Sequence, residues 1–347
     1  MPEKSKALNI ILLFLILYIL KTGQAIFLPF VVALFFWLLI YILSSAYSEI
    51  FVDRLKLPLW TRHFSRFLSI ITIAGIVYFI GIGIETNIND VYQAFGSYQK
   101  NMDAVFDKIQ SMFGIEHKIT FANIANDIDI PRAINSVVQG FASFLSQSLM
   151  VLVYLLFILL EEKSFSKKIP QIFSSKKKEN DMKKMFDKIY SKIEVYMTVK
   201  LFTSFLTGLL GYIVMRFVHL DFAMFWAILM FLFNFVPTVG SIISSVFPIM
   251  LALLQFNGDL VSFSIVSIGI ITIQLLIGNI VDPKIMGKRL NLSPLVLILS
   301  LVIWGSIWGV VGMFLCVPIM IIITIVLLQI PSTKKFAMLL TQDGETF

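Results

Sequence analysis

The chain has 347 residues, of which 58% are hydrophobic and only 14% are charged. Soluble globular domains average about 45–50% apolar and ~25% charged residues, so the composition excludes an ordinary soluble protein and predicts lipid as solvent for much of the chain. A net charge of +7 could indicate nucleic acid, but its distribution along the chain, given below, does not. The one cysteine, Cys316, lies in an apolar run and excludes an internal disulfide framework.

Apolar segments of membrane-spanning character recur along the chain. Their ranges are 7–20, 25–44, 67–86, 144–161, 197–218, 222–256, 259–281 and 291–330. The first follows a basic start, as in a secretory signal, but it has no small-residue cleavage site, so we interpret it as a retained helix. The sixth and eighth are too long for one simple helix, and both contain Pro and Gly. The sequence therefore predicts an all-α polytopic membrane protein of about eight segments, two of them broken or hairpin-like.

The polar region 87–143 opens with a regular apolar pattern. Nine apolar residues from Ile84 to Met112 are spaced alternately by four and three positions, an unbroken 3.5-residue repeat. We expect the third segment to continue outward as one long helix. Its stripe would pack on a returning helix of the same chain or on a second subunit, so a homo-oligomer is one prediction.

The distribution of Lys and Arg predicts the orientation in the membrane. Of the 28 basic residues, 21 lie in the N-terminus, the C-terminal tail, 45–66, 162–196 and 283–290. All five segments fall on one side only if 222–256 and 291–330 each enter and return. By the positive-inside rule that side is cytoplasmic, which places both termini there in a multi-pass plasma (inner) membrane protein.

The lysine-rich stretch 176–196 has an apolar face and a lysine face. Such a helix lies well on an anionic leaflet, although a solvated linker helix would look the same. Membrane lipids are therefore the expected partner of the basic charge, and nucleic acid is not. These patterns predict six parts. They are 1–86 with three membrane helices, 87–143 as an extracytoplasmic helical excursion, 144–161 as the fourth membrane helix, 162–196 as a basic cytoplasmic loop with an amphipathic helix, 197–330 as a C-terminal membrane domain with broken segments, and 331–347 as a cytoplasmic tail.

The segment 232–254 carries helix breakers and polar residues where lipid should be. Freed backbone groups in a membrane must be satisfied by protein, water or a ligand, and broken helices form substrate sites in many transporters. A kinked packing helix with small residues for close contact is the alternative. The candidates for contact with a small polar solute are Asn234, Pro237, Thr238, Gly240, Ser241 and Ser244.

A second polar group surrounds the sequence GNIVDPK at the end of the seventh segment. Gln274 and Asp282 are eight residues apart, which puts them within about 80° of each other on a helix, and Asn279 lies between them. With Lys200, these residues are the candidates for ion coupling. Alternatively, Asp282 caps the turn at Pro283 or pairs with Lys284 or Lys200, and Lys200 only extends to the interface.

Other features favour packing over chemistry. Gly305, Gly309 and Gly312 form a small-residue face suited to tight helix crossing, and Glu161-Glu162 would pair with adjacent lysines. The sequence contains no GxxxxGK[ST] motif and its three histidines have no metal-ligand spacing. We therefore expect no catalytic residues, no metal, no cofactor and no enzyme activity.

Two stretches of the C-terminal half resemble a known family. FNFVPTVGSIISSVFPIMLALL and GNIVDPKIMGKRLNLSPLVLILSLVIWGSIWGVVGMFLCVPIMIII look like the signature region of the autoinducer-2 exporter (AI-2E) family of permeases, and the layout is similar over roughly 8–340. The positions that match its pattern are Asn234, Pro237, Gly240, Ser241, Pro248, Gly278, Asn279, Pro283, Met286, Gly287, Gly309, Gly312 and Pro318.

The resemblance implies an oligomeric inner-membrane permease of about eight spans. Members are linked to export of autoinducer-2, a small furanosyl quorum-sensing signal, and others to sodium or lithium tolerance by proton antiport. Three positions depart from the pattern expected of the autoinducer exporters: Asp282 stands where Glu is common, Thr238 where Asn is common, and Thr324 where a basic residue often occurs.

We therefore expect a secondary permease that exports a small polar solute, autoinducer-2 in particular. The broken segments 232–254 and 291–330 would meet near the membrane midplane, with Asp282 coupling a proton or cation. One alternative is a sodium (lithium)/proton antiporter, which needs Asp282 in the ion path. The other is a membrane scaffold without transport, assembled through the 84–112 repeat.

Overall fold

The computed structural model describes residues 2–54, 56, 63–84, 86–87, 90, 148–172, 176–256, 259–287 and 291–344. These residues form helices and no strand, apart from one isolated bridge between Leu292 and Thr341. The prediction of an all-α membrane protein is therefore confirmed. Apart from Ile84 and three residues that follow it, the 84–112 repeat and the 87–143 excursion lie outside the described residues.

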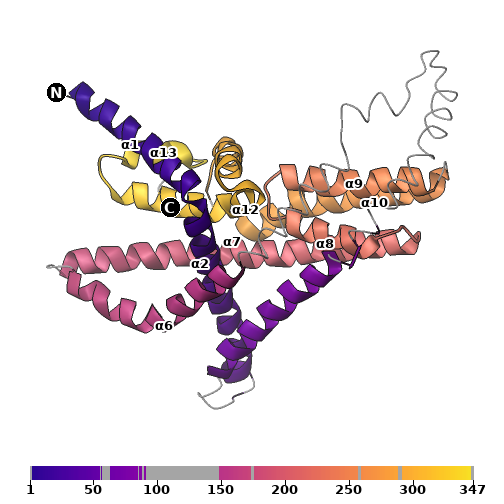
Figure 1. The fold of residues 1–347 in the computed structure, drawn as a ribbon, viewed down its shortest axis with the longest axis horizontal. Helices are drawn as coiled ribbons and strands as arrows, with labels where there is room; N and C mark the ends of the chain where they lie inside the picture. The colour runs from indigo at the N-terminus through magenta and orange to yellow at the C-terminus, as the bar shows by residue number, and fades with distance from the viewer. Residues whose placement is uncertain are drawn as a thin grey trace. The chain divides into compact units, whose positions relative to one another are not determined.

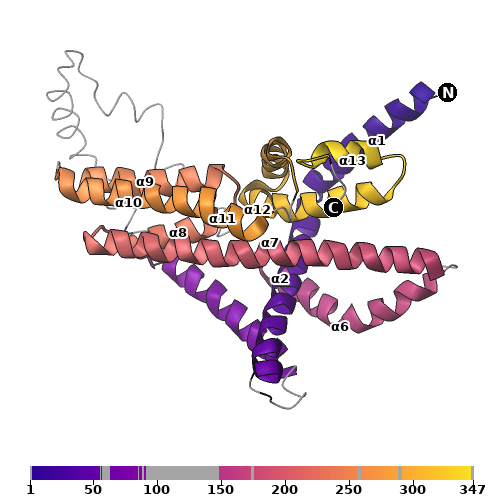
Figure 2. The same cartoon turned by 180° about the vertical axis from the view of Figure 1, so that it is seen from behind.

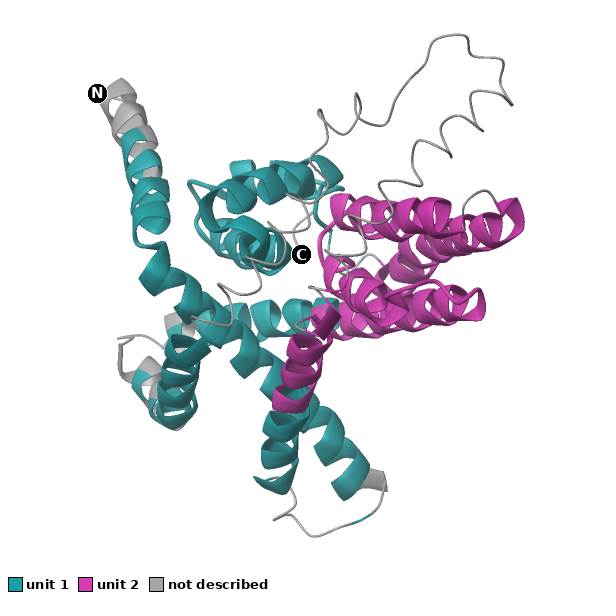
Figure 3. Cartoon of the chain, turned by 45° about the vertical axis from the view of Figure 1, so that its right-hand side comes forward, with its two compact units in different colours: residues 1–73, 140–196, 289–347 teal, residues 74–139, 197–288 magenta. Residues whose placement is uncertain are grey.

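The chain divides into two compact units, which Figure 3 shows in different colours. Unit 1 comprises Met1–Ile73, Gly140–Tyr196 and Arg289–Phe347, and unit 2 comprises Ala74–Gln139 and Met197–Lys288. The six-part organisation predicted from the sequence follows membrane topology, which these units do not test, so it stays a prediction.

Unit 1 is built from long apolar helices. In chain order these are α1 (Pro2–Thr22), α2 (Gln24–Ser48) with its extension η1 (Glu49–Arg54), the start of the helix His63–Ile84, α6 (Ser148–Ile172), the first half of α7 (Lys176–Phe217), α12 (Pro294–Gln329) and α13 (Lys334–Leu340). Figure 1 labels α1, α2, α6, α7, α12 and α13. Its core joins α2, α6 and α12 through Val32, Ala33, Val151 and Leu315. These side chains are buried against one another, and this apolar contact holds the three helices together.

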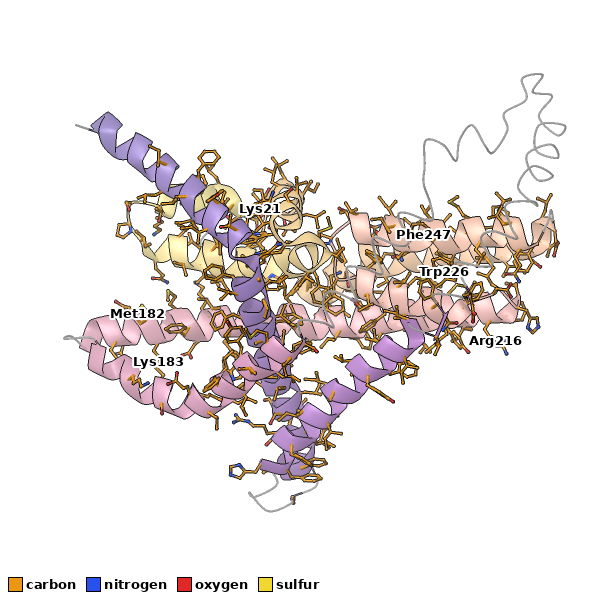
Figure 4. All side chains as sticks on the ribbon, in the orientation of Figure 1. Lys21, Met182, Lys183, Arg216, Trp226 and Phe247 are labelled. Carbon is orange, nitrogen blue, oxygen red and sulfur yellow. The ribbon has the colours of Figure 1, made fainter. Side chains whose placement is uncertain are left out.

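Unit 2 contains the rest of α7 and a set of shorter helices. They are α8 (Ala223–Phe233), α9 (Val239–Gln255), α10 (Leu260–Leu276), η2 (Ile277–Val281) and α11 (Asp282–Met286). The helices α8, α9 and α10 pack in sequence order, and Figure 2 shows α9 beside α10. Figure 4 labels Trp226 on α8 and Phe247 on α9, whose rings stack with centroids 6.0 Å apart.

The turn between α9 and α10 shows how α10 begins. Asp259 is its N-cap and accepts hydrogen bonds from the Val261 N–H at 3.1 Å and from the Ser262 hydroxyl at 2.6 Å. Both bonds lower the pKa of the exposed Asp259 carboxyl below its ordinary value. The bond from the Ser262 hydroxyl has the larger effect and the bond from the Val261 N–H the smaller one.

The broken sixth segment is a hairpin. The chain leaves α8 after Phe233, turns through 234–238 and returns as α9. At 1.5 Å per residue, the 11 residues of α8 span ~16 Å, about half of a ~30 Å hydrocarbon core. A helix of this length cannot cross a bilayer alone, so of the two hairpin forms the geometry favours a re-entrant loop over paired spans.

The broken eighth segment, α12, is also folded back on itself. Gly309 has non-helical angles, with φ 62° and ψ −144°, in the middle of the helix. The Ser300 hydroxyl donates a hydrogen bond to the Cys316 carbonyl at 3.3 Å, whereas sixteen residues of straight helix would separate them by ~24 Å. The two halves of α12 therefore form a tight hairpin with Gly309 at its bend.

The amphipathic helix predicted over 176–196 is present, but it is the first part of a longer helix. The helix α6 continues to Ile172, and α7 is one helix of 42 residues that includes 176–196 without interruption. Figure 4 labels Met182 and Lys183 in its first part and Arg216 near its end. Lysine is a good helix former, so the charged stretch can continue directly into the apolar half of α7.

The apolar face of the first half of α7 packs on protein. Met185, Ile193 and Tyr196 are buried, and the ring of Tyr190 contacts that of Tyr41 at 4.9 Å between centroids. The 3.6-residue pattern that predicted a leaflet-facing helix is the same for a helix that faces protein, and here unit 1 covers much of that face.

Five described helices are long and apolar enough to cross a membrane. They are Gln24–Val52, His63–Ile84, Glu179–Phe217, Leu260–Met286 and Pro294–Gln329. Large apolar side chains such as Phe79, Phe217 and Leu295 are exposed on them, which is the surface that lipid covers.

Candidate functional site

A buried polar face runs along α7 in unit 2. Lys200, Thr203, Ser204 and Thr207 follow the i, i+3, i+4, i+7 spacing of one helix face, and the three hydroxyl residues are completely buried. The Thr207 hydroxyl donates to the Thr203 carbonyl at 2.8 Å, so it is satisfied within α7. Lys200 and Ser204 instead reach other segments of the unit.

The first of these links joins α7 to the turn between α8 and α9. The amide nitrogen of Asn234 donates a hydrogen bond to the Ser204 hydroxyl at 3.1 Å, and both side chains are buried. Asn234 directly follows the last residue of α8, so this bond holds the end of α8 on α7.

The turn itself is tight and strained. Thr238 has φ 56° and ψ −58°, and the Val239 N–H donates to the Pro237 carbonyl at 2.6 Å, which defines the rare positive-φ γ-turn. A β-branched residue at positive φ is an outlier that usually costs energy. Gly240 follows, and a Cβ there would overlap the Phe233 carbonyl oxygen, so only glycine lets α9 start this close to α8.

A row of hydroxyl groups begins α9 and leads to α10. Ser241 donates to the Thr238 carbonyl at 2.7 Å, and Ser244 donates to the Ser241 carbonyl at 3.2 Å. The amide nitrogen of Gln274 on α10 then donates to the Ser244 hydroxyl at 3.2 Å. This is the second link between neighbouring segments through polar side chains.

The third link is an ion pair between α7 and the start of α11. Lys200 Nζ lies 2.5 Å from Asp282 Oδ2, and the two side chains are only 12% and 11% exposed. The other carboxylate oxygen, Oδ1, is buried and has no hydrogen-bond partner among the described residues.

The π-helical turn η2 places Asp282. Its five residues, Ile277–Val281, come directly before Asp282, and Pro283 follows without a backbone N–H. A π turn winds more residues per turn than an α-helix, so it reduces the 80° offset expected between Gln274 and Asp282. Single π turns inside helices occur frequently at functional sites.

Five of the ten predicted site residues take part in the three links. They are Asn234, Ser244, Gln274, Lys200 and Asp282. Of the alternatives for Asp282, pairing with Lys200 is the one observed.

The other five lie outside these links. Pro237, Gly240 and Ser241 belong to the turn and the start of α9, and the remaining two are exposed. Asn279 is exposed on η2, and Thr238 is exposed with its hydroxyl donating to the adjacent Pro237 carbonyl at 2.8 Å. The other broken segment, 291–330, belongs to unit 1, and its predicted meeting with 232–254 stays a prediction.

Sequence reasoning did not identify Ser204 as the partner of Asn234, thirty residues away. In unit 1, Glu162 pairs with Arg66 at 3.1 Å, which the sequence did not indicate, and Glu161 pairs with nearby Lys168 at 3.4 Å, as expected. Neither missed partner carries a local signal, because both depend on the tertiary fold.

The described residues contain no group of three or more His, Cys, Asp or Glu side chains that could hold a metal ion. In the described part of unit 2, every charged side chain except Lys200 and Asp282 is exposed. The positive charge of Lys200 neutralises the negative charge of Asp282. The site therefore offers hydroxyl groups, amide groups and one neutralised ion pair. This arrangement can bind through hydrogen bonds.

Comparison with known proteins gives consistent relatives over the whole chain. A family model described as AI-2E family transporter matches residues 8–332. A Haemophilus influenzae protein named "Putative transport protein" is 31% identical over 350 residues, which cover 98% of this chain and 97% of the relative. The AI-2 transport protein TqsA of Escherichia coli is 27% identical over 337 residues, covering 95% and 93%. The chain therefore belongs to the AI-2E family of transporters.

Proposed function

We propose that this transporter is a secondary permease that exports a small hydroxyl-rich solute, with autoinducer-2 as the specific candidate. The observation that carries the proposal is the set of three polar links among α7, the α8–α9 turn, α9, α10 and α11, all inside one unit. Polar side chains inside membrane segments are costly and mark substrate paths. The similarity to TqsA supports autoinducer-2 as the solute.

In this proposal the hairpin tip contacts the solute. Asn234, Ser241 and Ser244 offer amide and hydroxyl groups, whereas Pro237 and Gly240 shape the turn that presents them. Thr238 is exposed at the tip and meets solute only at the mouth of the path. A hydroxyl-rich solute would replace weak internal bonds, such as the 3.2 Å bond from Gln274 to Ser244, with bonds of its own.

The sodium (lithium)/proton antiporter remains the second candidate. It is favoured by the buried carboxylate of Asp282, and it requires that a cation displace the Lys200 ammonium from that carboxylate. A scaffold without transport would leave the three polar links with a packing role alone.

We further propose a plasma-membrane location with both termini in the cytoplasm and a homo-oligomeric assembly. The basic residues near the N-terminus, in 162–196 and in the C-terminal tail support this orientation. The re-entrant length of α8 supports it too, because an entering and returning hairpin keeps these segments on one side.

Efflux from proteoliposomes loaded with autoinducer-2 tests the proposal. We expect the wild-type chain to release the solute faster than protein-free liposomes, and Gln274→Leu to lower the rate by about tenfold, since one lost hydrogen bond of ~1.4 kcal/mol changes a rate or affinity tenfold. Gln255 is the matched control, because its amide donates to the His219 carbonyl at 2.9 Å, away from the polar links. Gln255→Leu should keep the wild-type rate; equal release with and without protein would refute the proposal.

A further inference from the structure

Only one of the two carboxylate oxygens of Asp282 has a hydrogen-bond partner among the described residues. Oδ2 accepts from Lys200, whereas Oδ1 is buried with no hydrogen-bond partner among the described residues. Buried polar atoms nearly always have a partner, because leaving one without a hydrogen bond forfeits its interaction with water. Oδ1 therefore needs a donor from outside the described protein.

The charges around this carboxylate are already balanced. Lys200 on α7 faces it, and the residues that precede it on η2 and α10 toward Gln274 are uncharged. The other charged side chains in the described part of unit 2 are exposed: Asp90, Arg216, Asp221, Asp259 and Lys284. A charged ligand at Oδ1 would add a buried charge without a counter-charge, whereas an uncharged hydroxyl would add only a hydrogen bond.

A role as carrier of a coupling ion fits this arrangement poorly. A proton on Asp282 would leave the Lys200 ammonium buried without its counter-charge, and a metal cation would first have to displace that ammonium. A hydroxyl donor, in contrast, can occupy Oδ1 while the ion pair at Oδ2 stays intact.

We propose that Asp282 determines solute specificity by accepting a hydroxyl of an uncharged solute at Oδ1, and that it carries neither a coupling proton nor a coupling cation. The inference rests on the proposed permease function and deepens it by naming the solute class and the residue that selects it. Lys200 is then a positioning residue that balances the charge and orients the carboxylate. Because Oδ1 is closed to solvent, the solute reaches it only when the contact between α7 and α11 opens.

The test uses the full-length chain in proteoliposomes with a pH-sensitive dye in the lumen. The probes are autoinducer-2 and ribose as uncharged hydroxyl-bearing solutes, and sodium ion as the cation. Each is followed with and without an imposed pH gradient. The variants are Lys200→Met/Asp282→Leu, which removes both charges together, and Asp282→Glu, which keeps the carboxylate.

We expect the wild-type chain to move an uncharged probe at a rate that is independent of the pH gradient and with no change of luminal pH. In the double variant the Michaelis constant should rise at least tenfold, while its thermal midpoint in detergent stays near that of the wild type. Asp282→Glu should rescue the Michaelis constant to within about threefold, which a merely structural ion pair would not require.

Two results would overturn the inference. If solute or sodium moves in exchange for protons and the exchange disappears in the double variant, Asp282 carries the coupling ion. If the double variant keeps the wild-type Michaelis constant, Oδ1 binds only water. The proposed function fails separately: movement of ribose without autoinducer-2 rejects the named solute and leaves the role of Asp282 intact.

Discussion

The two hairpins of this transporter arise from the same sequence signal but have different interiors. The α8–α9 hairpin turns at Pro237-Thr238 and is joined to α7 and α10 by polar side chains. The α12 hairpin turns at Gly309, and its close contacts are mainly apolar. Prolines and glycines in an overlong apolar segment thus predict where the chain returns, whereas the polar residues beside the bend distinguish the hairpin with polar contacts from the apolar one.

The interior of the α12 hairpin shows the apolar case. A Cβ at Gly305 would meet the Met313 side chain at 2.8 Å, and one at Gly312 would overlap the Trp304 carbonyl oxygen. Trp304 packs on Trp308, whose indole N–H donates to the Leu20 carbonyl at the break between α1 and α2. The glycine face predicted for tight helix crossing therefore packs the two halves of one segment together.

The largest expected effect comes from the ion pair, which the α12 hairpin lacks. Lys200→Met leaves the Asp282 carboxylate buried without a counter-charge, so we expect a loss of about 3–5 kcal/mol in the free energy of unfolding. Thermal unfolding in detergent measures it. Lys284→Met, at an exposed position on α11, is the control and should lie within ~0.5 kcal/mol of the wild type. A small loss in Lys200→Met would mean that Asp282 finds another partner.

Both hairpins depend on a close glycine, so their stability should respond alike. In Gly240→Ala the new methyl overlaps the Phe233 carbonyl, and in Gly312→Ala it overlaps the Trp304 carbonyl. Because a backbone atom cannot move aside as a flexible side chain can, each substitution should cost about 3 kcal/mol. Gly81→Ala is the control, since its Cβ meets nothing within 4 Å. If one hairpin tolerates the methyl, the two bends are not equally tight.

Much of the fold was open to prediction from the sequence. The overlong lengths of 222–256 and 291–330, together with their breakers, predicted two returning segments, and the structure has a turn at 234–238 and a bend at Gly309. These predictions succeed because membrane thickness limits the length of a single helix. Helices were predicted over 176–196 and 197–218, but their continuity as α7 was not, because the change from charged to apolar residues does not show whether the helix is interrupted.

The candidate site was only partly open to prediction. Polar residues in apolar segments pointed to Asn234, Gln274 and Asp282, but Lys200 and Lys284 were equally good partners for Asp282 on sequence alone. Lys200 lies 82 positions from Asp282 and Lys284 only two, so the choice between them depends on how α7 packs on α11. The π turn η2 has no reliable sequence signal either, and it alters the direction in which Asp282 points.

A pair of smaller substitutions separates the polar hairpin from the apolar one by function. Asn234→Ala leaves the buried Ser204 hydroxyl without its partner, and Ser300→Ala removes the bond to the Cys316 carbonyl. Each should cost about 1–2 kcal/mol of stability. We expect only Asn234→Ala also to lower solute efflux in proteoliposomes, by about tenfold. Equal loss of efflux in both variants would remove the functional distinction between the hairpins.

The smallest effect concerns the bends themselves. Gly309 adopts φ 62° without strain because it has no Cβ, whereas Thr238 adopts φ 56° with a branched side chain. We expect Thr238→Gly to raise the free energy of unfolding by about 1 kcal/mol, and Thr238→Ala, which keeps a Cβ, to give less than half of that gain. Thermal unfolding compares the two variants. If the strain helps the hairpin tip to open, the stabilised Thr238→Gly chain will also transport solute more slowly than the wild type. If the efflux rate of Thr238→Gly matches the wild type, the strain at this bend has no part in transport.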